Sequence, residues 1–135
     1  MQTVEKYIYA KLKADTTLAR ILEATSRNSK IFPIVPIEFE DYPCLTYEVI
    51  DENTNTTPKN TELVEMEFKA FSKGYSNRSK CEAIIQEVFE NLQYCKNMDN
   101  KIIYMKQVMR DDIPEQDRDL YAIMVRYQVW IRSDI

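Results

Sequence analysis

The clearest pattern along the chain is a helical spacing of apolar residues near positions 79–95. Apolar side chains there recur at intervals of three and four residues, which places them on one face of an α-helix. Ser79 and Glu82 have the spacing of a capping box, and Ser76 is an alternative N-cap. We therefore predict a long amphipathic helix that packs on a sheet. Its apolar stripe consists of Cys81, Ile84, Ile85, Val88, Phe89 and Leu92.

Two further helices are predicted near the N-terminus. Val4, Ile8 and Leu12 recur every four residues within 3–14, so this segment has one apolar face. Asp15 interrupts the stripe and is well placed to cap a second, short helix, so we expect a break there. The apolar face of the second helix consists of Leu18, Ile21 and Leu22.

Alternating apolar and polar residues predict a hairpin in the middle of the chain. Residues 44–50 and 61–72 alternate with a period of two, as strands with one buried face do. The polar residues 51–60 between them predict a long loop. Upstream, 31–36 is rich in proline, which cannot donate a hydrogen bond to a neighbouring strand, so we expect an edge strand or an extended arm. Gly74 marks the turn into the long helix.

A second hairpin is predicted at the C-terminal end. Residues 101–109 alternate less cleanly, and the acidic stretch 111–119 predicts a loop. The last strand is long and has two distinct faces. One face carries Tyr121, Ile123, Val125, Tyr127, Val129 and Ile131. The opposite face carries Ala122, Met124, Arg126, Gln128 and Trp130.

These elements predict an α+β fold in a single domain that spans residues 1–135. An antiparallel sheet of four to five strands would carry the long helix and the N-terminal helix. A chain of 135 residues, 44% hydrophobic and 30% charged, fits one globular domain that buries its own core.

The residue inventory excludes several kinds of active site. The chain has no histidine, which removes Ser-His-Asp catalysis and every histidine-ligated metal site. Its single glycine removes glycine-rich phosphate loops. The acidic pairs at 51–52 and 111–112 lie in polar segments, so we interpret them as solvated charge rather than as a Mg²⁺ or Ca²⁺ site. We therefore predict no enzyme, no cofactor and no metal. An enzyme that uses carboxylates alone would need a buried acidic pair with raised pKa values.

Charge and cysteine content favour a cytoplasmic protein that does not bind nucleic acid tightly. The formal net charge is −4, whereas proteins that grip phosphate backbones are usually basic. The N-terminus has no secretory pattern, and no apolar run is long enough to span a bilayer. Cys44, Cys81 and Cys95 are expected to be reduced. The last two would share the long helix, too far apart for a disulfide.

Two kinds of surface are candidates for partner contacts. One is the outward face of the last strand, because methionine, tryptophan and arginine are enriched at interfaces. The alternative is that this face packs against the N-terminal helix. Its residues are Met124, Arg126, Gln128 and Trp130. The other is the acidic 111–119 loop, which could dock a partner, repel DNA in a channel or only solubilise the hairpin tip. By elimination, the polar 51–60 loop is a further candidate for partner contacts. The candidate residues of these two loops are Asp111, Asp112, Glu115, Asp117, Asp51, Asn53 and Asn55.

Several short motifs follow one another in a distinctive order. The opening helix at 4–15 precedes a short helix that ends near Leu22, and then come Ile31-Phe32-Pro33 and Tyr42-Pro43-Cys44-Leu45-Thr46-Tyr47. A strand ending in Phe68-Lys69-Ala70-Phe71-Ser72-Lys73-Gly74-Tyr75 leads directly into the long helix. Each motif is weak, but their order over nearly the whole chain resembles the tail completion, or tail terminator, proteins of long-tailed bacteriophages and prophages.

The resemblance implies a structural role without catalysis. Such proteins cap the head-proximal end of the tail tube as a ring of about six subunits and join it to the head connector. The implied partners are further copies of this chain, the tail tube protein and the head completion or connector protein. DNA would pass through the ring lumen only as cargo, and no membrane is involved. The implied locations are the bacterial host cytoplasm during assembly and the head–tail junction of the virion. The low glycine content and the 51–60 loop depart from the family's pattern, which leaves the partner-contact loops undefined.

The alternative from a different class is a generic cytoplasmic binding or regulatory module that self-associates through its last strand. A stable two-fold dimer with a large apolar interface would favour this alternative, whereas rings or tube caps would favour the assembly role.

Overall fold

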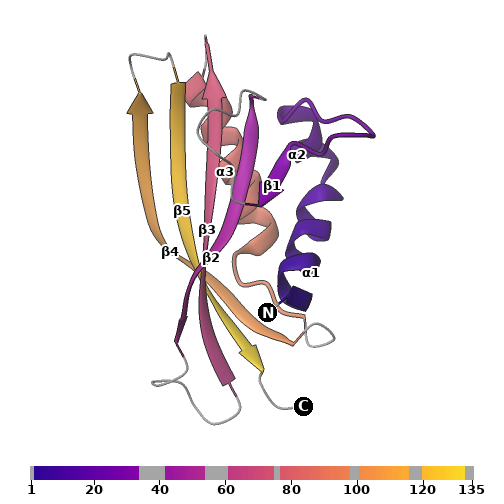
Figure 1. The fold of residues 1–135 in the computed structure, drawn as a ribbon, viewed down its shortest axis with the longest axis vertical. Helices are drawn as coiled ribbons and strands as arrows, with labels where there is room; N and C mark the ends of the chain where they lie inside the picture. The colour runs from indigo at the N-terminus through magenta and orange to yellow at the C-terminus, as the bar shows by residue number, and fades with distance from the viewer. Residues whose placement is uncertain are drawn as a thin grey trace.

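A computed structural model gives the fold of the chain (Figure 1). The residues that it describes are 2–33, 42–53, 61–74, 77–97, 101–115 and 120–132. Within these residues, three helices pack on a mixed five-stranded sheet, so the predicted α+β class is confirmed.

The sheet has the strand order β1-β2-β3-β5-β4. Its strands are β1 (Ile31–Pro33), β2 (Cys44–Asn53), β3 (Thr61–Lys73), β4 (Ile102–Glu115) and β5 (Leu120–Arg132). Neighbours run antiparallel except for β1, a short edge strand parallel to β2. The edge position agrees with the proline in β1. The sheet twists so strongly that the left-to-right order of β4, β5, β3 and β2 at its upper end is reversed at its lower end in Figure 1.

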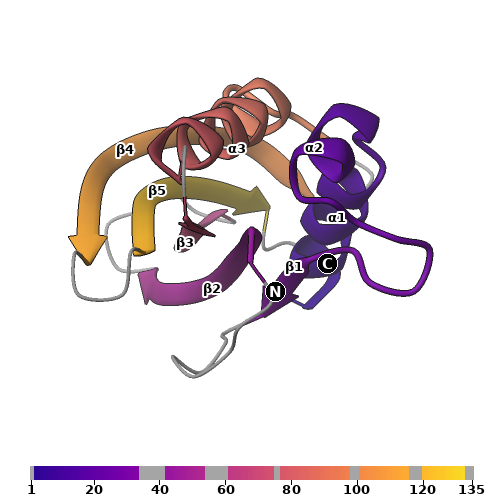
Figure 2. The ribbon, with the colours of Figure 1, turned by 90° about the horizontal axis from the view of Figure 1, so that it is seen from above.

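Two helices at the N-terminus meet at the predicted break. They are α1 (Gln2–Lys13) and α2 (Thr16–Ile21). Asp15 caps α2, because its Oδ1 accepts hydrogen bonds from the backbone N–H of Thr17 at 2.9 Å and of Leu18 at 3.2 Å. Figure 2 shows both helices beside β1, on the same side of the sheet as the third helix.

The third helix, α3 (Asn77–Leu92), is the predicted amphipathic helix with two corrections. It begins before Ser79, which therefore lies in the first turn and is not the N-cap; the alternative cap, Ser76, lies outside the described residues. The sequence pattern predicts Phe89 on the buried stripe, but 38% of this residue is exposed. The buried stripe is narrower and consists of Cys81, Ile84, Ile85, Val88 and Leu92.

The cysteines are free, but their predicted arrangement is wrong in one respect. Because α3 ends at Leu92, Cys95 lies beyond the helix that holds Cys81. Tyr94 has a φ of +59°, the left-handed conformation that often ends a helix and turns the chain. Burial is the main cause that raises the pKa of the Cys81 thiol to about 12, and the nearby Cys44 adds to the shift. This thiol therefore stays protonated and unreactive.

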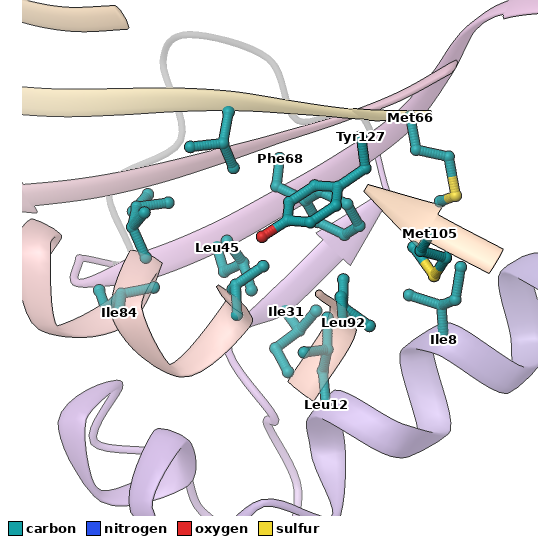
Figure 3. Close-up of a cluster of buried hydrophobic side chains, with 14 of the residues drawn as sticks. Ile8, Leu12, Ile31, Leu45, Met66, Phe68, Ile84, Leu92, Met105 and Tyr127 are labelled. Carbon is teal, nitrogen blue, oxygen red and sulfur yellow. The ribbon is translucent and has the colours of Figure 1, made fainter. Parts of the chain in front are cut away.

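The core lies between the helices and one face of the sheet. Phe68 on β3 and Tyr127 on β5 pack edge to face with ring centroids 5.7 Å apart (Figure 3). The Tyr127 hydroxyl donates to Gln107 Oε1 at 3.0 Å, and burial raises the pKa of Tyr127. Ile8 and Leu12 bring α1 onto the same cluster. The aromatic pair of β3 and β5 therefore belongs to the same hydrophobic core as the apolar faces of α1 and α3.

Both predicted loops are shorter than expected. Residues 51–53 continue β2, and residues 111–115 continue β4, where they pair with 120–124 of β5. The acidic composition misled the prediction, because hydrogen bonding to a long apolar neighbour holds charged residues in a strand whose side chains can still reach water. The tips, 54–60 and 116–119, lie outside the described residues.

Candidate interaction surfaces

The predicted face of the last strand lies on the side of the sheet away from the helices. Val125, Tyr127 and Val129 point into the core, so the alternating residues between them point the other way. We call this side the outer face. The helix α1 packs on the opposite side through Val4 and Ile8, so the alternative of a packing layer between α1 and this face is wrong. The outer face includes Met124, Arg126, Gln128 and Trp130.

The sheet register brings one predicted acidic residue onto this face. Asp111 pairs with Met124 across the β4–β5 ladder, and Lys69 pairs with Met124 from the β3 side. In the next row of residues on this face, Met109 of β4 pairs with Arg126 of β5. Asp111 from the predicted acidic loop and the predicted residues of the last strand therefore lie on one face of the sheet.

The sheet register links two predicted residues of β2 to residues of the last strand. Asp51 pairs with Glu65, which in turn pairs with Gln128, and Asn53 is linked in the same way to Trp130 through Leu63. The side chains of Asp51 and Asn53 are outside what the structure describes, as are all of Asn55 and Asp117 and the side chain of Glu115.

Asp112 belongs to the other side of the sheet, facing α3. Its carboxylate accepts a hydrogen bond from the Tyr121 hydroxyl at 2.9 Å and one from Arg110 Nε at 3.3 Å. Burial opposes the negative charge, but these hydrogen bonds outweigh it and hold the pKa of Asp112 below its usual value. Arg110 also lies 3.8 Å from Glu82 of α3. Asp112 therefore ties β4 to its neighbours and is a structural residue.

An ion-pair cluster at the centre of the outer face escaped the sequence analysis. Glu67 is only 7% exposed, and its carboxylate lies 3.2 Å from Lys69 Nζ and 3.3 Å from Arg126 Nη2. The outward face of β3 carries two glutamates followed by Lys69, which was the available signal in the sequence. The partner of Glu67 on β5 depends on the register of the sheet. This cluster fixes the orientation of Arg126 on the face.

Exposed apolar side chains gather around β4, and they too were missed. Val108 and Met109 are each 43% exposed, Ile113 is 38% exposed, and Phe89 and Tyr94 flank the strand from α3 and the turn after it. A register shift at Val108, between Gln107 and Met109, breaks the alternation and explains why the pattern of this strand was unclear.

The described residues include few candidates for a metal or small-molecule site. Among them, no group of three or more Cys, Asp or Glu side chains could hold a metal ion. A shallow hollow of ≈ 350 Å³ is lined by Glu5, Lys6, Tyr9 and Tyr47. Burial, followed by the charge of Glu5, raises the pKa of Tyr47, so its hydroxyl is a weak acid there. No helix in the described part of the chain is both long and apolar enough to cross a membrane.

The self-association route of the alternative hypothesis meets a topological obstacle. β5 lies between β3 and β4 and is paired along both edges. It therefore has no open edge for a second copy, and only its outer face is available for contacts.

Comparisons by sequence find no relatives: no family model matches the chain, and no curated protein matches it. Comparison of structures finds the same fold in a chain of the structure described as "Virion of native gene transfer agent (GTA) particle". The TM-score is 0.68, and the match covers 93% of this chain and 91% of the other. The sequence identity is 11%, so the likeness establishes a shared fold.

Proposed function

We propose that this protein is a structural component of a phage-like virion that caps the head-proximal end of the tail tube and joins it to the head connector. The observation that carries the proposal is the fold shared with a chain of a gene transfer agent virion over nearly the full length of both chains. The order of sequence motifs, which resembles the tail terminators, supports the same role. No sequence relative contributes to the argument.

In this role the chain acts through its surfaces. Subunits form a closed ring by heterologous contacts, in which one patch of a subunit meets a different patch of the next. The outer face suits such a contact, because it presents Trp130 and the oriented Arg126, whereas Met124 on the same face is buried. The tail tube protein and the head connector are the partners above and below the ring. The ring is built in the host cytoplasm and remains at the head–tail junction, with DNA passing through its lumen.

Electron microscopy of the purified protein, alone and with the tail tube protein encoded near it, tests the assembly role. We expect rings or capped tubes of defined length. Particles that stay monomeric or two-fold dimeric under both conditions, with tubes of uncontrolled length, would refute the role. The order of neighbouring genes gives a second check, since head connector and tube genes should adjoin.

A pair of variants tests whether the outer face forms the contact. Trp130→Lys places a charge on this face, so we expect rings to be lost while the far-UV circular dichroism and thermal melting remain close to those of the parent protein. Ser26→Lys adds the same charge at an exposed turn on the helix side and should leave the rings intact. Equal assembly by both variants would exclude the outer face as the ring contact.

A further inference from the structure

β4 is an edge strand of the sheet, and its first half is already closed by the chain itself. The segment 93–97, which follows α3, lies along it. The Tyr94 N–H donates to the Met105 carbonyl at 2.9 Å, and Asn97 and Ile102 exchange backbone hydrogen bonds at 2.8 and 2.9 Å. The Gln107 N–H donates to the side-chain oxygen of Gln93 at 2.8 Å. The closure ends at Gln107.

In the part of the chain that the structure describes, no segment pairs with the second half of β4, residues 108–115; we call it the open edge. Met105 and Gln107 direct backbone groups outward, and their β5 partners are Val129 and Tyr127. The backbone groups of successive residues in an antiparallel strand point to opposite sides of the strand. Every second residue of β5, counted from Val129, therefore pairs with a β4 residue whose N–H and C=O point away from the sheet. The bulge at Val108 adds a residue to β4, but the alternation still holds when it is counted along β5.

The open edge therefore presents a defined set of main-chain groups. The register assigns outward N–H and C=O groups to Arg110 and Asp112, which pair with Val125 and Ile123. Pro114 falls on the same outward set, and its missing N–H consequently costs the sheet no hydrogen bond. Within the described residues, no other strand lies along this edge.

Apolar side chains flank the open edge on both sides. Met109 and Ile113 are exposed on the outer face. On the other side is Phe89 of α3, on the same helical face as Glu82 and one turn before Gln93, which follows the helix; Glu82 and Gln93 both contact β4. Natural edge strands usually discourage pairing with charge and bulges. This edge also has charged residues, Pro114 and the bulge at Val108, which make it selective among strands. The exposed apolar groups beside the open backbone favour a strand whose side chains complement them.

The charge of the edge argues against a second copy as that strand. Residues 108–115 hold one arginine against two aspartates and one glutamate. If two copies of this edge paired antiparallel about a two-fold axis with matching hydrogen bonds, the residue on the axis would lie opposite its own copy. With the axis near the middle of the open edge, the residue on the axis would be Arg110, Asp111 or Asp112. Like charges directly opposite each other are destabilising. A strand with a basic residue opposite Asp111 meets no such penalty.

We propose that the open edge of β4 binds an extended segment of a different protein chain by strand addition. That segment carries apolar, basic and apolar residues at alternate positions, opposite Met109, Asp111 and Ile113. Its main chain pairs with the outward groups of Arg110 and Asp112. The proposal rests on the edge alone and does not depend on the assembly role.

A synthetic strand of this chemistry tests the proposal on the full-length protein. The probe is a blocked, labelled Val-Thr-Val-Thr-Lys-Thr-Val-Thr-Val peptide, compared with one that has glutamate in place of lysine and with one methylated at every backbone nitrogen. Fluorescence anisotropy should show saturable binding of the lysine peptide, binding about threefold to tenfold weaker for the glutamate peptide, and none for the methylated peptide. Amide hydrogen exchange at Arg110 and Asp112 should slow when the lysine peptide binds.

Matched variants locate the binding on the edge. Asp112→Pro removes one outward N–H, whereas Asp112→Ala removes the same carboxylate and keeps the N–H, so only the proline variant should lose binding relative to the alanine variant. Asp111→Lys should reverse the preference between the two charged peptides. The proposal is overturned by equal binding of the methylated peptide, by no saturable binding of the lysine peptide, or by protection of Arg110 and Asp112 that rises with protein concentration without any peptide.

Discussion

At the scale of single residues, a carboxyl pair joins α2 to α3. Asn91 Nδ2 donates to Asp15 Oδ2 at 2.6 Å, and Glu87 lies close to the same carboxylate. Burial, followed by the hydrogen bond with Asp15 and its negative charge, raises the pKa of Glu87 from 4.5 to about 7. Burial would also raise the pKa of Asp15, but hydrogen bonds from Asn91, Glu87 and the α2 backbone outweigh it and lower that pKa below 3.8. The opposite shifts assign the proton of this pair to Glu87 and the negative charge to Asp15.

These opposite shifts predict a pH dependence of folding stability. A carboxyl group whose pKa is higher in the folded protein stabilises the fold below pH 4.5, and that contribution is lost as the pH rises through about 7. Glu87→Gln should therefore flatten the decline between pH 4.5 and 7, as measured by urea unfolding at several pH values. Asp15 acts in the other direction, and its contribution disappears as the pH falls below 3.8. An unchanged decline in the glutamine variant would contradict the assignment to Glu87.

The Glu67 cluster on the outer face predicts a second residue-scale effect. Glu67→Gln leaves Arg126 without its carboxylate partner in a half-buried position, so we expect a loss of about 1–2 kcal/mol in unfolding free energy, between the values for exposed and buried pairs. Arg126→Met in the same background should recover part of the loss, because no unpaired charge then remains. Denaturant unfolding of the parent, both single variants and the double variant measures the coupling; additive losses would show that the pair is not coupled.

At the scale of elements, α3 separates a buried stripe from an exposed apolar position. Ile85 is 3% exposed, whereas 38% of Phe89 is exposed one turn further along. Ile85→Asp buries a charge in the core, so we expect a loss of more than about 4 kcal/mol and failure to fold. Phe89→Asp, the matched control on the same helix, should cost about 1 kcal/mol or less. Thermal melting compares the two, and a cooperative, stable Ile85→Asp protein would contradict the placement of this helix.

The β4 strand shows how one element can serve two purposes. Its first half is closed by the segment after α3, which the left-handed Tyr94 turns onto the strand edge. Its second half keeps its hydrogen bonds to β5 on one side and leaves the other side open. The change occurs at Val108, where the register shifts. β4 therefore stays paired with β5 on one side along its whole length, and only the backbone of its second half is available to a further strand.

At the scale of the whole molecule, the net charge of −4 predicts weak contact with DNA. A protein through which DNA passes gains nothing from binding phosphates tightly, and an acidic chain releases few counterions from the duplex. Labelled duplex DNA should show no saturable binding at micromolar protein, even at about 50 mM salt, where such binding is strongest. Tight binding that weakens steeply with added salt would contradict this expectation and with it the role of DNA as passing cargo.

The sequence alone determined the features that depend on local spacing. The stripe of α3, the alternation in β3 and β5 and the cap at Asp15 each follow from neighbours a few residues apart, because helix and strand periods decide which side chains share a face. The tertiary structure decided which strands pair and in which register. That pairing kept the acidic residues 111–115 in β4, set Glu67 against Arg126, exposed Phe89 and left the far side of β4 open. These features depend on partners tens of residues away, and local composition carries no record of where such partners will lie.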